Sequence, residues 1–200
     1  EAGLKVTEDR ARAAGTVSRL TLITADISDE AVVKDKIGGA IAKVGRLDVV
    51  VNAAGILRSE HTHKTSLEFW NRILAVNLTG TFLVTRECLP LLLASGRGVV
   101  VNFSSTSASF AHPYMAAYAA SKGGIQAFTH TIALEYASQG LRAVSVAPGS
   151  IESGMTRNPG IPADGDMMLF AKMSPALGQG FAGAQAVAGV VAMLASDDGS

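Results

Sequence analysis

The chain has 200 residues, which is enough for one compact domain with its own core and too few for two. Hydrophobic residues make up 48% and charged residues 17%, a balance that excludes an intrinsically disordered chain. Seventeen basic residues cancel seventeen acidic ones, and the apolar runs are far shorter than the roughly 20 residues that span a bilayer. We therefore expect neither nucleic acid nor a membrane as a partner. The single cysteine, Cys88, cannot form an internal disulfide and is typical of a reducing compartment, which favours the cytoplasm.

Short apolar runs alternate with helical patterns along the chain. The runs rich in β-branched residues predict strands over residues 20–25, 47–51, 98–103 and 141–147. Helical patterns, several of them with apolar residues three and four apart, predict helices over residues 8–14, 28–44, 67–93, 116–137 and 182–195. Ser28 is the expected N-cap of the second helix, Gly45 its expected end, and Asn77 and Gly80 are weak points inside the third.

This alternation predicts a doubly wound α/β fold, in which a Rossmann-like parallel sheet lies between two layers of helices in a single domain, residues 1–200. Ligands of such sheets bind outside the carboxyl ends of the strands. The polar and turn-forming residues at those ends are Asp26, Asn52-Ala53-Ala54-Gly55, Ser104-Ser105 and Pro148-Gly149. We expect the functional site at this edge.

Tyr118 and Lys122 lie four residues apart on a predicted helix, so their side chains project from the same face. A free phenol has a pKa near 10, and a neighbouring ammonium favours the phenolate. Such a pair can exchange a proton with an alcohol or ketone oxygen, to which Ser105 could donate a hydrogen bond. A lone Tyr-x-x-x-Lys also arises by chance, with the tyrosine packing and the lysine solvating the helix surface.

Agreement among several motifs favours the chemical interpretation. They are Asn52-Ala53-Ala54-Gly55 after a strand, Asn77 within a helix, Ser105 before Tyr118, Ala120-Ser121-Lys122, and Pro148-Gly149 after the next strand. In this order and spacing the sequence resembles the short-chain dehydrogenase/reductase family. The resemblance implies a catalytic tetrad of Asn77, Ser105, Tyr118 and Lys122. Tyr118 would be the general acid/base, Ser105 would polarise the substrate oxygen, Lys122 would lower the tyrosine pKa and bind the nicotinamide ribose, and Asn77 would hold a relay water.

The same resemblance implies which residues contact NAD or NADP, between which the sequence does not choose. Asp26 and Ile27 match the position beside the adenine, and Asn52, Ala53, Ala54 and Gly55 match the family's Asn-Asn-Ala-Gly turn with one Asn replaced. Tyr118, Lys122, Pro148, Gly149, Ile151 and Ser153 match the nicotinamide side, where Ser153 replaces the usual Thr.

The family's glycine-rich first turn, which cradles the pyrophosphate, has no counterpart here, since Gly38-Gly39 lies inside a predicted helix. In the family's strand order, two strands would lie between the runs at 20–25 and 47–51. We therefore expect the given sequence to be an excerpt that lacks the first βαβ unit and the last strand.

The substrate side is less specific. Ser105 and Tyr118 would contact the reacting oxygen, while His112 either lines the pocket or only turns the chain at Pro113. Residues 154–181, which include Met155, resemble the family's mobile substrate lid, and their methionines favour a moderately apolar alcohol or ketone. The pair His61-x-His63 has no third ligand, and we predict no metal.

The sequence therefore predicts an NAD(P)-dependent oxidoreductase that interconverts a secondary alcohol and a ketone. One alternative is a non-catalytic relative that keeps the fold as a binding or regulatory module. Another is a sugar-nucleotide epimerase or dehydratase, which the short lid disfavours. Two helices, at about 80–94 and 116–137, resemble those that assemble family members, which implies a homotetramer or homodimer.

Overall fold

Three parallel strands form the centre of the molecule in a computed structural model that describes residues 2–174 and 180–199. In spatial order they are β1 (Val49–Asn52), β2 (Val99–Phe103) and β3 (Arg142–Val146). The register pairs Val50 with Val100 and Val100 with Ala143. The predicted parallel α/β class and these three predicted strands are confirmed.

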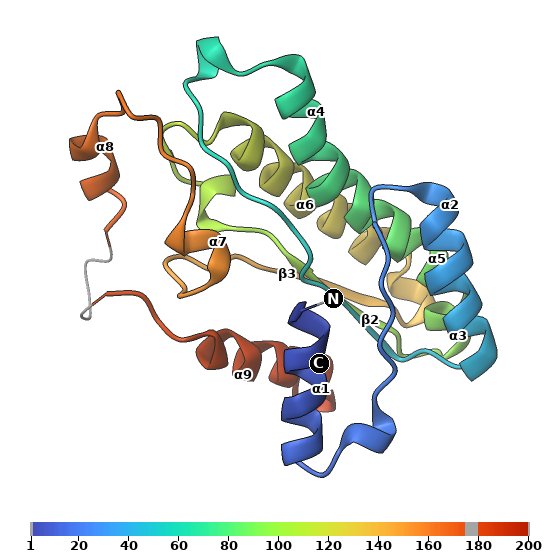
Figure 1. Cartoon of the computed structure of the whole chain (residues 1–200). Helices are drawn as coiled ribbons and strands as arrows, with labels where there is room; N and C mark the ends of the chain where they lie inside the picture. Colours follow the sequence, from blue (N-terminus) through green and yellow to red (C-terminus); the bar gives the residue numbers. More distant parts are fainter. Residues whose placement is uncertain (1, 175–179, 200) are drawn as a thin grey trace.

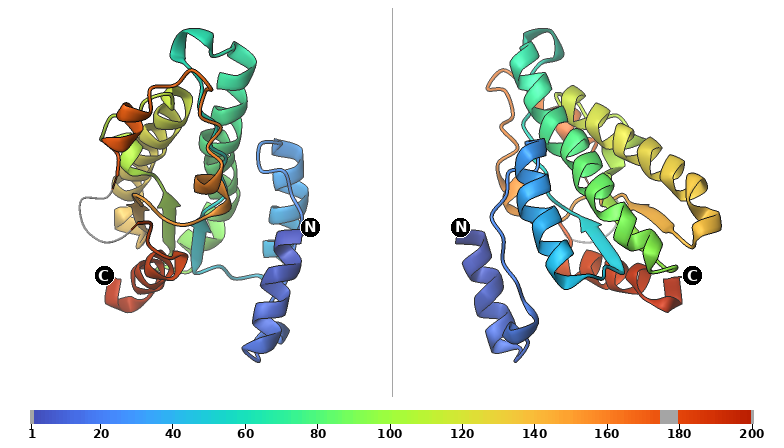
Figure 2. Two further views of the ribbon diagram at one scale, coloured as in Figure 1. Left: turned by 60° about the vertical axis from the view of Figure 1, so that its left-hand side comes forward. Right: turned by 90° about the vertical axis from the view of Figure 1, so that its right-hand side faces the viewer.

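One face of the sheet carries the main core. It is covered by α3 (Gly39–Val44), α5 (Gly80–Ala94) and α6 (Ala116–Glu135), as Figures 1 and 2 show. The buried side chains of this core are Val50, Cys88, Leu92, Val100, Ile132 and Leu141. Burial raises the pKa of the Cys88 thiol to about 11, so this cysteine packs as an apolar side chain.

Helix α9 (Ala184–Ala195) crosses the other face of the sheet over β2. Its carboxyl end is fixed by the guanidinium of Arg142 on β3, which donates to the carbonyl oxygens of Leu194 (3.2 Å), Ser196 (2.9 Å) and Gly199 (2.8 Å). On this face Val101 of β2 is fully buried, whereas its neighbour Val51 of β1 is 43% exposed. The cover on this face is therefore centred on β2 and leaves β1 open.

The long helices contain wider turns. The second predicted helix consists of α2 (Glu30–Val32), a π-helical stretch (Val33–Gly38) and α3, and it ends at Gly45 with φ 72°. The third consists of α4 (Leu67–Leu74), a π-helical stretch (Ala75–Thr79) and α5. The second π stretch contains Asn77 and precedes Gly80, the two weak points that the sequence predicts. Such turns occur frequently at functional sites.

The amino-terminal quarter departs from the predictions. Helix α1 (Ala2–Ala13) and a 3-10 turn (Val17–Arg19) precede residues 20–25, which are extended but unpaired within the described part of the chain. The predicted strand there is therefore wrong, because a strand needs a neighbour and no described segment pairs with it.

The N-cap prediction is also corrected. Asp29, not Ser28, caps α2, because its carboxylate accepts the N–H groups of both Ala31 (2.9 Å) and Val32 (3.1 Å).

The segment after β3 is largely irregular. It contains two short helices, α7 (Gly154–Arg157) and α8 (Met167–Ala171), and a bridge that pairs Ile151 with Ala182. Residues 175–179 of the predicted lid lie outside the described residues. Among the helices that the structure describes, none is long and apolar enough to cross a membrane.

Candidate active site

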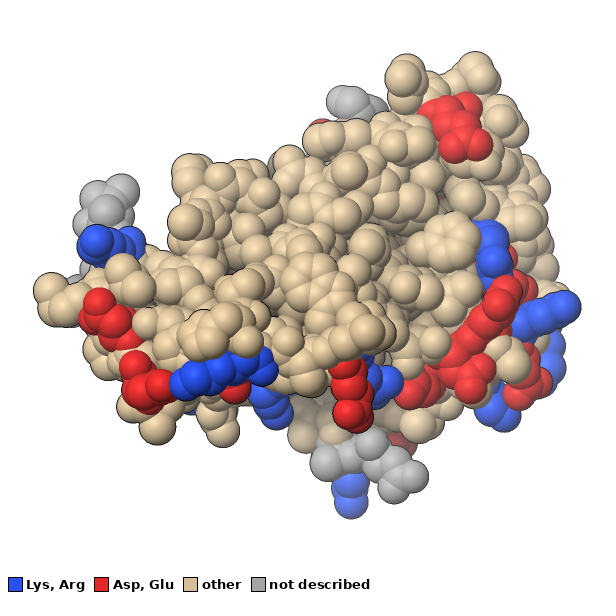
Figure 3. All heavy atoms as spheres, turned by 90° about the horizontal axis from the view of Figure 1, so that it is seen from above, with Lys and Arg blue, Asp and Glu red and all other residues tan. Residues whose placement is uncertain are grey.

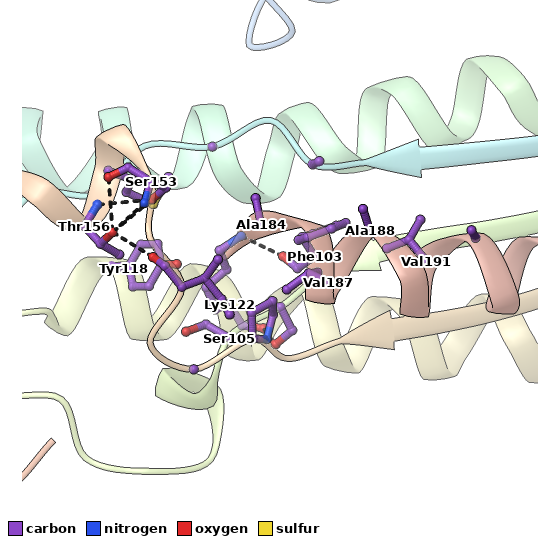
Figure 4. A pocket seen from close by; sticks show the side chains of 18 of the residues that line it. Phe103, Ser105, Tyr118, Lys122, Ser153, Thr156, Ala184, Val187, Ala188 and Val191 are labelled. Carbon is purple, nitrogen blue, oxygen red and sulfur yellow. Dashed lines mark hydrogen bonds between the residues drawn. The ribbon is translucent and has the colours of Figure 1, made fainter. Parts of the chain in front are cut away.

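A cavity of about 550 Å³ opens at the carboxyl ends of the strands, a volume typical of small-molecule sites. Its walls come from the turns after all three strands, from α6, from the α7 region and from α9 (Figure 4). The predicted site residues that line it are Ala53, Gly55, Ser105, Tyr118, Lys122, Pro148, Gly149, Ile151, Ser153 and Met155. The fold therefore brings most of the predicted site together at the predicted edge.

Lys122 is a buried cation at the centre of this cavity. Its ammonium donates to the main-chain carbonyl of Phe103 at 2.6 Å, and its Nζ lies 5.6 Å from the centre of the Tyr118 ring. Burial lowers the pKa of Lys122 from 10.5 to about 8. Ser104 donates to the Lys122 carbonyl at 3.0 Å, which ties this turn of α6 to the end of β2. Because an ammonium has three N–H donors, Lys122 can bind further acceptors in the cavity.

Tyr118 is buried beside Lys122, and its titration differs from the prediction. Burial raises the pKa of the phenol, and the hydrogen bond with Ser105 opposes that rise. The expected lowering of this pKa by Lys122 is not seen in this arrangement, in which desolvation of the phenolate outweighs the hydrogen bond with Ser105. Tyr118 is therefore a protonated acid at neutral pH in this arrangement.

Asn77 is fully buried in the π-helical turn and links three parts of the site. Its Nδ2 donates to the Ile56 carbonyl (2.9 Å) and to Ser121 Oγ (3.0 Å), and its Oδ1 accepts the Ile56 N–H (2.8 Å). The amide therefore fastens the turn after β1 to α6. Both Nδ2 hydrogens have protein acceptors, so the side chain has no donor left for the relay water that the resemblance implies.

Several residues matched to cofactor contacts do not line the cavity. Asn52 points into the protein, where its Nδ2 donates to Thr85 Oγ1 (2.9 Å) and Asn102 Oδ1 (2.8 Å). Asp26 accepts from Ser28 Oγ at 2.6 Å, Ile27 packs against Gly80, and neither reaches the cavity. Ala54 also lies outside the lining. Their contacts with a cofactor stay a prediction.

Ser153 and Thr156 form a reciprocal cap at the start of α7. Ser153 Oγ accepts the Thr156 N–H at 3.2 Å, and Thr156 Oγ1 accepts the Ser153 N–H at 3.0 Å. This arrangement holds the cavity-lining turn after β3 (Figure 4). His112 is not in the lining, and its ring lies 3.4 Å from Thr106 Oγ1 and 3.0 Å from the Phe110 carbonyl, consistent with the turn-forming alternative.

The sequence reasoning missed one wall of the cavity. Small and β-branched residues of α9 line it, namely Ala184, Val187, Ala188, Val191, Ala192 and Ala195. Their spacing of three and four residues is a signal of one helix face, although it does not say what that face meets. Phe103 and Thr156 were missed as well.

The fold and this site define a class of protein. A family model described as short chain dehydrogenase matches residues 3–161, so the chain belongs to the short-chain dehydrogenase family. The crystal structure of gox2181 superposes with a TM-score of 0.86 at 27% identity and covers all of this chain and 77% of that one.

Among curated proteins, two relatives come from Xanthobacter autotrophicus. The "Inactive 2-(S)-hydroxypropyl-CoM dehydrogenase 2" is 42% identical over 131 residues, which cover 66% of this chain and 57% of the relative. The 2-(R)-hydroxypropyl-CoM dehydrogenase is 38% identical over 138 residues, which cover 68% and 55%. The chain thus spans about half the length of the curated relatives it matches.

The residues present fit one end of a nicotinamide dinucleotide. Gly55 leaves the space in front of Asn77 and Lys122 open, because a Cβ there would come within 3.2 Å of Asn77 Oδ1 and 3.8 Å of Lys122 Nζ. The buried ammonium supplies donors for hydroxyl groups, and the alanine and valine face of α9 supplies an apolar wall. Lys122, Ser153 and the turn at Gly149 would hold the cofactor.

Proposed function

We propose that this protein is an NAD(P)-dependent oxidoreductase that interconverts a secondary alcohol and a ketone. The observation that carries the proposal is the buried group of Ser105, Tyr118 and Lys122 in one cavity at the carboxyl edge of the sheet. The dinucleotide would supply or accept the hydride when bound. Membership of the short-chain dehydrogenase family supports the same reaction class.

In the direction of ketone reduction, Tyr118 gives its proton to the substrate oxygen, and in alcohol oxidation it takes that proton back. Its raised pKa suits the acid form, and the hydrogen bond from Ser105 moderates that rise. Ser105 polarises the substrate oxygen by donating a hydrogen bond to it. Lys122 brings a positive charge to the phenolate as it forms, since the two side chains are one helical turn apart. Asn77 keeps the turn at Gly55 in place through Ile56.

We infer a moderately apolar substrate from the side chains that surround Tyr118. Leu57, Ile73, Met115 and Ala117 form a buried apolar cluster with it, and Met155, Phe170 and Met173 pack on that cluster from residues 154–174. Seen from the side that Figure 3 shows, the molecule has a broad area without charged side chains, which lie mainly towards the edges of the view.

We also propose a homodimer or homotetramer built on α5 and α6. Phe82 of α5 is 40% exposed and meets Phe128 of α6 edge to face, while Leu134 of α6 is 83% exposed. Apolar side chains exposed on adjacent helices favour contact with a second copy. Sedimentation of the full-length protein measures the mass of the assembly.

The test of the reaction class is titration of the full-length natural protein with NADH and with NADPH, read as nicotinamide fluorescence. We expect one of the two to bind, and the bound form to be oxidised by members of a panel of apolar ketones. Lys122→Met is the matched variant, because it keeps the length of the side chain and removes the donors; we expect weaker binding. A folded protein that binds neither nucleotide would contradict the proposal and favour the non-catalytic module.

A further inference from the structure

Three segments meet above Tyr118 in what we call the lid seam: loop 56–65, loop 110–115 and residues 158–171. The main chain links them twice, through the Ser59 N–H to the Pro159 carbonyl (2.9 Å) and the Glu60 N–H to the Tyr114 carbonyl (2.8 Å). None of these contacts belongs to the sheet or to a helix. The seam is therefore a separate attachment of residues 158–171 to the body of the protein.

Tyr114 stands at the centre of the lid seam and contacts both other segments. Its hydroxyl accepts the main-chain N–H of Asp166 at 2.8 Å, and its ring stacks on Phe170 of α8 with centres 5.6 Å apart. On its other side, the ring meets His61 edge to face at 5.0 Å. Gly165 permits the turn that precedes Asp166, since a Cβ there would lie 2.9 Å from the Pro162 carbonyl oxygen.

The backbone of Tyr114 is strained. Its φ of 65° is the one positive value of a non-glycine residue among residues 2–174 and 180–199. A bulky side chain rarely adopts this conformation, and it persists only where the surroundings impose it. Here the conformation is matched by contacts on three sides, which points to a role for the side chain beyond turning the chain before α6.

An ion-pair cluster closes the outer side of the same seam. The Asp164 carboxylate accepts a hydrogen bond from the Lys64 ammonium at 2.7 Å. Its other oxygen lies 2.9 Å from Nε2 of His61. These two partners hold the pKa of the Asp164 carboxyl well below its usual range. Asp164 is exposed to solvent, so the cluster supports the aromatic contacts and does not replace them.

The seam adjoins the buried apolar cluster that contains Tyr118. Phe170, which stacks on Tyr114, also packs on the cluster that contains Tyr118 and Met115. Tyr114 is four residues before Tyr118, at the entry to the helix that carries the acid/base. One residue thus connects the position of α8 to the start of α6.

We propose that Tyr114 is a positioning residue that holds residues 158–171 over Tyr118 and so completes the substrate-side wall. The proposal rests on the proposed function for its effect on catalysis, but the contact itself does not. It sets how tightly an apolar substrate is enclosed and leaves the chemistry at Tyr118 and the nucleotide side unchanged.

The test is Tyr114→Phe in the full-length protein, with Tyr136→Phe as the matched control. Tyr136 packs against the main core far from the seam. Tyr114→Phe keeps the ring stack and removes only the acceptor of the Asp166 N–H. We expect hydrogen exchange of the Asp166 amide to become roughly 5-fold faster, and the KM for a ketone to rise by about 2- to 10-fold with kcat and NAD(P)H affinity unchanged. Tyr136→Phe changes none of these.

A second pair of variants addresses the ion pairs. Asp164→Asn removes the carboxylate charge that pairs with Lys64 and His61. We again expect faster hydrogen exchange of the Asp166 amide and a higher KM for the ketone. The control is Asp35→Asn, whose carboxylate pairs with Lys36 on a remote helix.

The outcomes separate the two proposals. Unchanged exchange at Asp166 in Tyr114→Phe overturns the positioning role whatever the activity. Faster exchange with an unchanged KM also overturns it. Faster exchange in a protein that binds no nucleotide and turns over no ketone supports the seam contact and defeats the proposed function.

Discussion

The most informative single residue is Lys122, whose ammonium is buried and donates to the Phe103 carbonyl. Its pKa in the folded protein is about 8, below the unfolded value of 10.5. Between these values the unfolded chain holds a proton that the folded chain has released, so the free energy of unfolding rises with pH in that window. The buried charge therefore destabilises the folded protein at neutral pH.

Lys122→Met should remove this dependence. We expect the wild type to gain about 2 kcal/mol of unfolding free energy relative to Lys122→Met between pH 8 and pH 10, as measured by urea unfolding. The difference between the two proteins isolates Lys122 from other titrating groups. Parallel pH profiles of the two proteins would contradict the buried-ammonium account.

Site residues could be predicted from the sequence where their positions follow from spacing along one helix or from the end of a strand. Tyr118 and Lys122 share a helix, and Ser105 follows a strand, so their meeting was predictable from local patterns. The pKa of Tyr118 was not predictable, because it depends on burial by segments distant in sequence. The same holds for Asn77, whose partners Ile56 and Ser121 come from a turn and from another helix.

Between elements, a buried polar ladder joins the sheet to its helices. Asn52 of β1 donates to Thr85 of α5 and to Asn102 of β2, and Asn102 in turn donates to Thr129 of α6 at 2.9 Å. These four side chains are almost or fully buried, where an unpaired N–H is costly. The ladder fixes the strand that ends at the active-site turn 53–55.

Thr85→Val tests this ladder. The substitution keeps the shape of the side chain but leaves one Asn52 N–H without an acceptor, so we expect a loss of about 1–3 kcal/mol in unfolding free energy. Thr131→Val is the control, because that hydroxyl donates to the Ala127 carbonyl at the exposed surface of α6. Equal stabilities of the two variants in urea would show that the ladder contributes nothing.

Helices and strands that are marked by a local sequence pattern could be predicted. Features that depend on pairing with a distant segment could not. The apolar periodicity of the helices and the β-branched runs of β1, β2 and β3 are local. The run at 20–25 has the same local character, yet it remains unpaired in the described chain. The N-cap moved from Ser28 to Asp29 because one carboxylate accepts two helix N–H groups at once.

For the whole molecule, the α/β class and the location of the site follow from alternation alone, since parallel strands bring their carboxyl ends to one edge. The cavity wall formed by α9 and the lid seam around Tyr114 could not be predicted, because both depend on how a largely irregular segment packs. The side chains of the proposed reaction lie together at this predicted edge.

The central claim is that Tyr118 transfers the proton in an NAD(P)-dependent reaction. Its most direct test is turnover of a ketone by Tyr118→Phe, measured beside NAD(P)H binding in the full-length protein, with Tyr136→Phe as the control. We predict that Tyr118→Phe loses roughly 10²- to 10⁴-fold in kcat while its nucleotide affinity stays unchanged, because only the transferable proton is removed. Retention of most of the activity by Tyr118→Phe would contradict the mechanism.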